Sequence, residues 1–287
     1  MLFNLHQPRW LAFIRSSLMY ILMPILAVNS YLLGTVFGPF ISYPKRFKLI
    51  IGTFCHSSIW LAKNVAGIHY QVEGLEHLPK DGRGYVIMSK HQSSWETLFL
   101  QNIFDPNTVV IKKEAAYLPF FGWGIALLNP IFINRKKGEH ALKQILEKGT
   151  ERLQRGEDIL IFPEGTRVDV GARKEFKKGG ALLACSSNAD IIPIALNSGE
   201  HWNNKRWLMV PGTIQVVIGP VISTKDKNWE SVNSEVENWI NTTVDRISAH
   251  PYQDGYEFDT SEYFITNAEL ISNLFKSSKK FLTHLMR

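Results

Sequence analysis

The chain has 287 residues, of which 45% are hydrophobic and 20% charged, and this is enough for one large core or one domain with an appendage. Its two cysteines, Cys55 and Cys185, show neither a pairing pattern nor metal-ligand spacing, which argues against an oxidising compartment and against a zinc site. The net charge of +6 comes from an apolar segment and not from an aromatic-basic recognition motif, so we expect no nucleic-acid partner.

The N-terminal segment carries this basic surplus. The first acidic residue is Glu73, and six lysines and arginines precede it, so the rest of the chain is balanced in charge. Residues 16–44 hold no charged side chain, and cations stand on both sides of them. An apolar run edged by cations suits a bilayer with anionic head groups. We therefore expect residues 1–67 to form a helical membrane anchor.

Two arrangements of this anchor fit the sequence. Residues 18–41 are long enough to cross a hydrocarbon core, which needs about 20 apolar residues in a helix, but prolines and glycines interrupt them. A second apolar stretch, residues 49–62, is too short to span alone. The segment is either one span with an amphipathic partner or two helices that dip into one leaflet. We favour the dip, which keeps both ends on the cytosolic side.

From residue 68 onward, short β-rich runs alternate with helical stretches. This alternation predicts an α/β domain over residues 68–225, with a mostly parallel sheet flanked by helices. Several strands are almost wholly apolar, as expected when both faces of a sheet are covered. In such sheets, active sites lie at the carboxyl ends of the strands. The predicted strands are 85–88, 109–111, 131–133, 159–162, 191–196 and 214–218, and the predicted helices are 95–104, 139–154 and 178–186.

The remaining residues, 226–287, are predicted to form a C-terminal helical region. Apolar residues recur at helical spacing from residue 262 to the end, with lysines between them. This pattern is typical of an amphipathic helix that packs on the domain, which we favour, or lies on the membrane surface.

A polar motif follows the strand predicted at 85–88, and it reads Ser-Lys-His-Gln-Ser-Ser-Trp-Glu over residues 89–96. His91 and Glu96 can meet if His91 stays in a loop and the helix starts after it. A carboxylate bonded to one imidazole nitrogen leaves the other free as a base for an alcohol. The same residues also read as a capping box, Ser93-x-x-Glu96, in which Glu96 bonds only the backbone. The motif alone leaves both interpretations open.

Three further motifs complete a recognisable set. Residues 162–167 read Phe-Pro-Glu-Gly-Thr-Arg, residues 129–135 read Asn-Pro-Ile-Phe-Ile-Asn-Arg, and residues 191–196 read Ile-Ile-Pro-Ile-Ala-Leu. With His91-x4-Glu96, in this order and spacing, they resemble the four motifs of the glycerolipid acyltransferase superfamily. The resemblance is strongest to its 1-acyl-glycerol-3-phosphate acyltransferase (lysophosphatidic acid acyltransferase) family. The N-terminal segment also looks like the anchor of bacterial members.

The chain departs from this family pattern at two positions. The family usually has Asp five residues after the histidine, where this chain has Glu96. The extra methylene can still reach the imidazole if the helix start shifts slightly. The second motif usually begins with Gly, where this chain has Asn129. Glutamate after the histidine also resembles the distantly related lipid A acyltransferases, which keeps the acceptor class open.

The resemblance implies a direct transfer. His91 would be the general base that deprotonates an acceptor hydroxyl, and Glu96 would orient it. The alkoxide would attack the thioester of acyl-CoA or acyl carrier protein without a covalent acyl-enzyme, and neither a metal nor a cofactor would be needed.

The resemblance also implies a site for the acceptor. Arg135 and Arg167 would hold its phosphate, because guanidinium forks match phosphate geometry. Glu164 and Gly165, with Thr166 in the same motif, would bind the glycerol portion. The alternative for Arg167 is an ion pair with Glu164 that merely shapes the turn.

Several other polar residues are compatible with a role at the site or on the surface. Lys113 could add charge to the phosphate site, but a solvated surface lysine is equally compatible with its position. Ser198 and Cys185 lack the surroundings of a nucleophile elbow. Lys177 and Lys178 are interpreted as part of a solvated face that could meet anionic lipid or an acidic carrier protein.

Together these features predict a membrane-bound acyltransferase that makes phosphatidic acid on the cytoplasmic face of a bacterial inner membrane, with a lysophosphatidate lipid and an acyl thioester as its partners. One alternative is an acyltransferase for another lysolipid acceptor. The other is a non-catalytic membrane adaptor that retains the fold.

Overall fold

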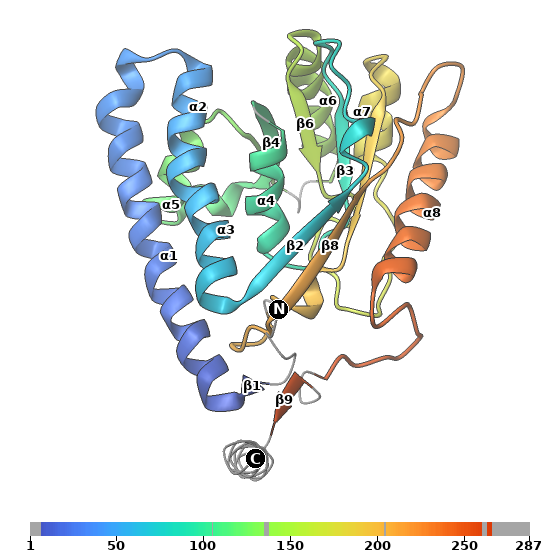
Figure 1. The fold of residues 1–287 in the computed structure, drawn as a ribbon. Coiled ribbons are helices and arrows are strands. Elements are labelled where there is room, and N and C mark those ends of the chain that lie inside the picture. The colour runs from blue at the N-terminus through green and yellow to red at the C-terminus, as the bar shows by residue number, and fades with distance from the viewer. Residues whose placement is uncertain (1–6, 105, 135–137, 204, 260–262, 266–287) are drawn as a thin grey trace, which may run out of the picture.

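The structure is a computed structural model that describes residues 7–104, 106–134, 138–203, 205–259 and 263–265. A seven-stranded sheet lies between two layers of helices (Figure 1). Its α-helices are α1 (Arg9–Phe37), α2 (Tyr43–Ile51), α3 (Ser57–Leu61), α4 (Trp95–Ile103), α5 (Phe121–Ala126), α6 (Gly138–Gln154), α7 (Gly179–Ser186) and α8 (Trp229–Ile247). Its strands are β1 (Gln7–Pro8), β2 (Ile68–Glu73), β3 (Val86–Ser89), β4 (Asn107–Lys112), β5 (Ile131–Ile133), β6 (Asp158–Ile161), β7 (Ile191–Leu196), β8 (Gly212–Ile218) and β9 (Phe264–Ile265).

The central sheet is largely parallel, as the alternation predicts. Its strand order is β2-β8-β7-β3-β6-β4-β5, and every pair is parallel except β7 with β8. All six predicted strands are present within these elements. Strand β2, which lies at the edge of the sheet, is not among the strands predicted from the sequence. Three of its six residues are exposed, so it lacks the continuous apolar run that identifies a covered strand.

Two apolar cores lie on opposite faces of the sheet because side chains alternate along each strand. In β3, Ile87 joins the core shared with α4 and the N-terminal helices. Its neighbours Val86 and Met88 join the core that α6, α7 and α8 cover. This coverage of both faces explains why β3 is buried at all four positions and why its first three residues are apolar.

The N-terminal segment is a helical hairpin. Helix α1 runs alongside a second helical stretch, residues 43–66, which consists of α2, a π-helical turn, α3 and another π-helical turn (Figure 1). The two lie close because small residues of α1 face the second stretch. A Cβ added at Gly34 would come within 2.8 Å of the Ile50 side chain, and the Ser30 hydroxyl donates to the Ile50 carbonyl at 2.9 Å.

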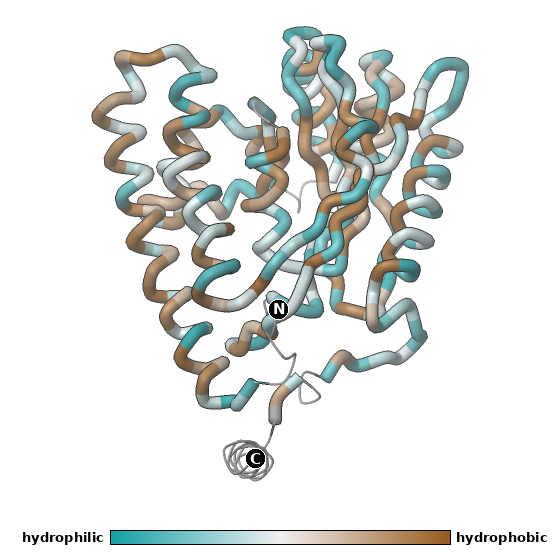
Figure 2. Tube along the Cα trace, in the orientation of Figure 1, coloured by the Kyte–Doolittle hydropathy of each residue, from teal (hydrophilic) through white to brown (hydrophobic). Residues whose placement is uncertain are grey.

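The hairpin is also part of the domain's core. Phe47, Ile50 and Ile59 are buried in the same cluster as the strand residues Ile87 and Leu160. Among the described residues, one helical stretch, Arg9–Phe40, is long and apolar enough to cross a membrane. Large exposed apolar residues occur along this stretch from Trp10 to Phe40, and most of its backbone is coloured as hydrophobic in Figure 2.

At the other end of the chain, α8 packs on β7 and α7. The amphipathic helix predicted from residue 262 onward lies outside the described residues except for Tyr263, Phe264 and Ile265, where β9 pairs with β1. The domain boundaries at residues 67 and 225 stay predictions.

Candidate active site

The proposed catalytic histidine lies where β3 ends. The chain leaves the buried strand at Lys90 and passes through residues 90–96, the catalytic loop, into α4. The imidazole of His91 stacks on Phe162, with ring centroids 4.1 Å apart. Its Nδ1 lies 2.8 Å from Glu96 Oε1, and its side chain is only 11% exposed. None of the described residues forms a hydrogen bond with Nε2 of His91, so that nitrogen is left for a ligand.

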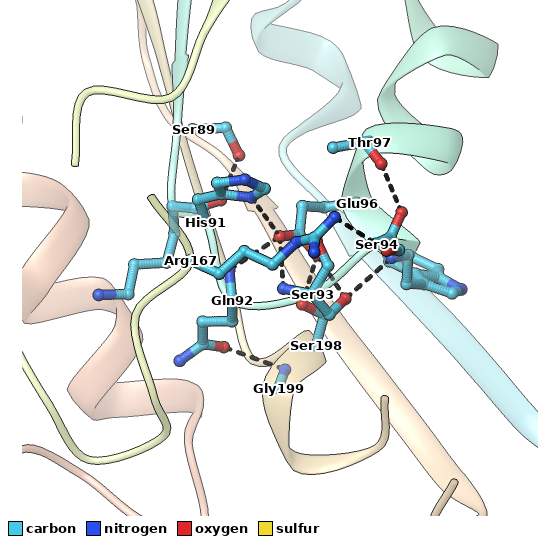
Figure 3. Close-up of polar contacts among 12 residues, drawn as sticks. Ser89, His91, Gln92, Ser93, Ser94, Glu96, Thr97, Arg167, Ser198 and Gly199 are labelled. Carbon is cyan, nitrogen blue, oxygen red and sulfur yellow. Dashed lines mark hydrogen bonds and ion pairs between the residues drawn. The ribbon is translucent and has the colours of Figure 1, made fainter. Parts of the chain in front are cut away.

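Glu96 is the most heavily bonded side chain of the site. Besides His91 Nδ1, its Oε1 accepts from the backbone N–H groups of Gln92 at 2.8 Å and Ser93 at 2.7 Å. Its Oε2 accepts from the hydroxyls of Ser93 and Ser198, each at 2.6 Å (Figure 3). Glu96 therefore makes the backbone contacts of a capping residue together with a contact to the imidazole, so the interpretation that it bonds only the backbone is wrong. One oxygen caps the loop and orients the imidazole at the same time.

These bonds also determine the charge of Glu96. The carboxyl group is fully buried, and burial by itself raises its pKa. The donors His91, Ser198 and Ser93 outweigh that effect and hold the pKa of Glu96 below its ordinary value. The site thus keeps a buried negative charge beside the imidazole.

The carboxylate of Glu164 is directed into the protein and not toward solvent, from where an acceptor would enter. Its side chain has no exposed surface, and its Oε1 lies 2.5 Å from Nζ of the equally buried Lys90. Its Oε2 accepts from the backbone N–H of His91 at 2.8 Å. The expected contact of Glu164 with glycerol is not supported by this geometry, because no part of the side chain faces solvent. Glu164 instead connects the segment after β6 to the catalytic loop.

The residues that follow Glu164 in the chain are the solvent-exposed part of the site. Residues 163–167, the arginine loop, follow β6, and Gly165 adopts a left-handed φ of 71° that favours glycine. Thr166 and Arg167 are exposed. Arg167 does not pair with Glu164, so the turn-shaping alternative is wrong. It donates instead to the carbonyl of Ser93 at 3.2 Å and the hydroxyl of Ser94 at 3.0 Å (Figure 3).

A lysine that the sequence analysis assigned to a solvated face lies over this loop. The Lys177 backbone N–H donates to the Pro163 carbonyl at 2.9 Å. A Cβ added at Gly165 would come within 2.9 Å of Cε and Nζ of Lys177. The lysine side chain therefore covers the glycine, and its ammonium group lies at the arginine loop. Within the described part of the chain, no carboxylate pairs with Lys177.

The remaining residues of the predicted site lie outside the catalytic loop and the arginine loop. Lys113 is exposed at the first residue after β4, on the same edge of the sheet as His91. Arg135 lies outside the described residues. Asn129, which replaces the family's glycine, adopts a φ of 49°. Asparagine tolerates this left-handed conformation better than most residues, which explains why the substitution is accommodated.

Two partners of these side chains are not evident from the sequence. Lys90 stands next to His91 in the motif, but only the fold shows that it is buried and paired with Glu164. Ser198 follows β7 and was considered only as a nucleophile, whereas its hydroxyl donates to Glu96. Since 102 residues separate Ser198 from Glu96, no local pattern could connect them.

Comparisons with known proteins agree with the motifs. A family model described as acyltransferase matches residues 69–197. The 1-acyl-sn-glycerol-3-phosphate acyltransferase of Pseudomonas aeruginosa is 42% identical over 241 residues, which are 82% of this chain and 92% of that protein. The mouse 1-acyl-sn-glycerol-3-phosphate acyltransferase alpha is 34% identical over 57% of this chain and 58% of its own length.

A solved structure supports the fold. The crystal structure of the 1-acyl-sn-glycerophosphate acyltransferase from Thermotoga maritima superimposes with a TM-score of 0.61. The match covers 82% of this chain and all of that one, at 23% sequence identity.

Proposed function

Since this chain belongs to the 1-acyl-sn-glycerol-3-phosphate acyltransferase family, we propose that it acylates the sn-2 hydroxyl of 1-acyl-glycerol-3-phosphate. The acyl group would come from acyl-CoA or acyl carrier protein, and the product would be phosphatidic acid for phospholipid synthesis. One observation carries the proposal. A buried carboxylate, Glu96, bonds Nδ1 of His91, and the other imidazole nitrogen is left for a substrate.

The reaction follows from this arrangement. Glu96 accepts a hydrogen bond from Nδ1–H of His91, so the lone pair of the neutral ring is on Nε2. Nε2 takes the proton of the sn-2 hydroxyl as that oxygen attacks the thioester carbonyl. The carbon–sulfur bond then breaks, and the thiolate takes the proton from the imidazolium. The charge of Glu96 stabilises the imidazolium between these two steps.

Recognition of the acceptor is assigned to the exposed residues of the same edge. Arg167 would bind the phosphate together with Arg135 and Lys113, because charged donors form the strongest hydrogen bonds to phosphate oxygens. Gly165 and Thr166 would lie against the glycerol portion. Glu164 is assigned to positioning the catalytic loop through Lys90.

We further propose that the enzyme works on the cytoplasmic face of a bacterial inner membrane. The N-terminal hairpin supports a dip into one leaflet, because the second helical stretch runs back alongside α1 and leads directly into β2 (Figure 1). Both ends of the hairpin then lie on the side of the catalytic domain. The acyl thioester is a substrate, and no resident cofactor enters this scheme.

The test is acyl transfer by membranes that contain the protein. They would be incubated with lysophosphatidate and either acyl-CoA or acyl carrier protein, and phosphatidic acid would be measured. Transfer to other lysolipids in preference to lysophosphatidate would replace the proposed acceptor. Absence of transfer from either donor to any lysolipid would support a non-catalytic adaptor.

A further inference from the structure

The active-site edge of the sheet has two kinds of loop. Strands β3, β4, β6 and β7 run parallel, so the loops after them leave the same edge. The loops after β3 and β6 carry His91 and Arg167. Among the described residues of the loops after β4 and β7, Ser198 is the one that bonds the histidine–carboxylate pair. Both loops extend toward the N-terminal hairpin. The exposed side chains of these two loops are not explained by the proton transfer at His91.

These two outer loops place large apolar side chains in solvent. After β4, Tyr117 is 68% exposed, Leu118 53%, and Trp123 46%. After β7, Trp207 is 51% exposed. Single exposed apolar residues are common on protein surfaces, but a group of them at one edge indicates an interaction site. We define Tyr117, Leu118, Phe120, Trp123 and Trp207 as the aromatic rim.

The aromatic rim is attached to one side of α1 at two points. Trp207 lies against Tyr20 with ring centroids 4.6 Å apart, and its indole N–H donates to the Ser17 hydroxyl at 3.1 Å. Trp123 lies 5.6 Å from the ring of Tyr31. Eleven residues make about three turns of an α-helix, so Tyr20 and Tyr31 point to the same side of α1. Both outer loops therefore contact the same flank of that helix.

The rim continues the apolar surface of α1. The exposed residues Phe13, Ile21, Ile25, Leu32 and Val36 follow one another at intervals of four, seven or eight residues, so they form one stripe along the helix. In Figure 2 hydrophobic residues prevail along this helix, with some hydrophilic residues between them. Since the rim lies on the flank of the same helix, the stripe and the rim form one apolar surface that begins on α1 and ends at the active-site edge.

The backbone at Phe120 is strained, and this strain fixes the direction of a partly exposed aromatic side chain. Its φ is 60° and its ψ is −53°, a conformation that bulky residues rarely adopt. Strain of this kind persists where a function requires a side chain in a fixed direction. Phe120 is 38% exposed and touches both Tyr31 and Trp123. It thereby keeps the tip of the loop packed beside α1.

We propose that the aromatic rim enters the bilayer interface and that it holds the active-site edge against the lipid surface. Tyrosine and tryptophan favour the head-group region because each has an apolar body and a polar tip. The exposed Lys112, which precedes the loop that carries Tyr117 and Leu118, matches anionic head groups. The inference rests on the proposed function, because a lipid acceptor must reach His91 from the membrane.

The test compares two exposed leucines at opposite edges of the sheet. Leu118 is in the rim, and Leu75 is 49% exposed just after β2, whose carboxyl end lies at the other edge because β8 is antiparallel to β7. In a Cys185→Ser background, Leu118→Cys and Leu75→Cys would each carry an environment-sensitive fluorophore, since the remaining Cys55 is buried. The full-length protein would be bound to phosphatidylglycerol–phosphatidylcholine vesicles with and without acyl-chain brominated lipid.

We expect bromine to quench the label at position 118 by about twofold or more and to leave the label at 75 unchanged. A water-like, unquenched label at position 118 on vesicle-bound protein overturns the inference. This readout does not depend on turnover, so it stands apart from failure of the proposed reaction. Deleting the hairpin is a poorer test, because Phe47, Ile50 and Ile59 belong to the sheet's core.

A second measurement uses activity. Tyr117→Ser with Leu118→Ser removes two exposed side chains, neither of which is assigned to chemistry. We expect the rate on lysophosphatidate in vesicles to fall about tenfold, from two lost interfacial anchors. The rate on detergent-dispersed lysophosphatidate should match that of the wild type and of a Leu75→Ser control. An equal fall in both formats, or in neither, contradicts the membrane role.

Discussion

The catalytic loop and the arginine loop lie side by side, but their polar groups are arranged in opposite ways. In the catalytic loop, Glu96 is fully buried and accepts five hydrogen bonds. In the arginine loop, Thr166 and Arg167 are exposed, and Lys177 lies beside them without a carboxylate partner among the described residues. The orientation of the histidine–carboxylate pair is therefore fixed before a substrate binds, whereas the cations that would bind the substrate are exposed to solvent.

The two loops are nevertheless one unit. Glu164 of the arginine loop bonds the backbone of His91, and Arg167 donates to the carbonyl of Ser93. The Val168 N–H also donates to the His91 carbonyl at 2.8 Å. Preorganised donors and acceptors cost little reorganisation during a reaction, and several connections between the loops provide that rigidity. Substitutions that separate positioning from recognition test this division.

The largest effect is expected from His91→Ala. A positioned general base contributes about two to four decades to the rate, so turnover should fall by that amount. The melting temperature should change little, because Nε2 has no partner among the described residues and Glu96 retains four other donors. Turnover and thermal unfolding would be measured on the same preparation. Near-normal transfer by the folded variant would remove the base assignment.

The next effect is on stability and concerns the buried pair of Lys90 and Glu164. Glu164→Gln leaves the Lys90 ammonium buried without a charge partner, which typically costs about 3–5 kcal/mol of unfolding free energy. Chemical denaturation would measure it. The matched double variant Lys90→Met with Glu164→Gln should recover a large part of that loss. If Glu164→Gln were as stable as the wild type, the pair would not hold the two loops together.

Arg167 should act on recognition and not on the proton transfer. Loss of a charged hydrogen bond corresponds to about 10- to 100-fold in affinity, so Arg167→Ala should raise the KM for lysophosphatidate by that factor. Monoacylglycerol, which lacks the phosphate, provides the comparison. Unchanged discrimination between these two acceptors would contradict the phosphate assignment. Because Arg167 also bonds Ser93 and Ser94, the variant's melting temperature serves as the control.

Glu96→Gln separates charge from hydrogen bonding inside the catalytic loop. The amide oxygen still accepts from the backbone, but the charge that stabilises imidazolium is lost, so activity should fall by at least about a decade. Glu96→Asp keeps the charge with the shorter side chain that is usual in the family. Partial activity in the aspartate variant and little in the glutamine variant would assign the effect to charge. Full activity of Glu96→Gln would leave His91 without a required charged partner.

The histidine–carboxylate contact of the catalytic loop can be predicted from the sequence, whereas the contacts of Glu164 in the arginine loop cannot. The His91–Glu96 contact follows from local spacing, because both residues lie within one strand-to-helix connection. The direction of Glu164 does not, since a hexapeptide motif names the residue without showing that Lys90, 74 positions away, lies opposite it. Strand β2 escaped detection for a related reason. Its edge position leaves polar residues exposed, and that pattern is typical of loops as well.

The smallest effect is expected at Lys177, and it sharpens the comparison most. If the open cations of the arginine loop recognise phosphate, then Lys177→Gln should weaken lysophosphatidate binding by less than Arg167→Ala, about three- to tenfold, because a flexible ammonium makes a single contact where a guanidinium makes two. The neighbouring Lys178 is a matched control, since its ammonium lies over the ring of Trp229, 5.9 Å from the centroid, and not over Gly165. The KM for lysophosphatidate should therefore rise in Lys177→Gln and stay unchanged in Lys178→Gln, with kcat unchanged in both. Equal effects of the two substitutions would indicate a general surface charge effect. In that case Lys177 would serve only to cover Gly165, and recognition of the phosphate would fall to the arginines.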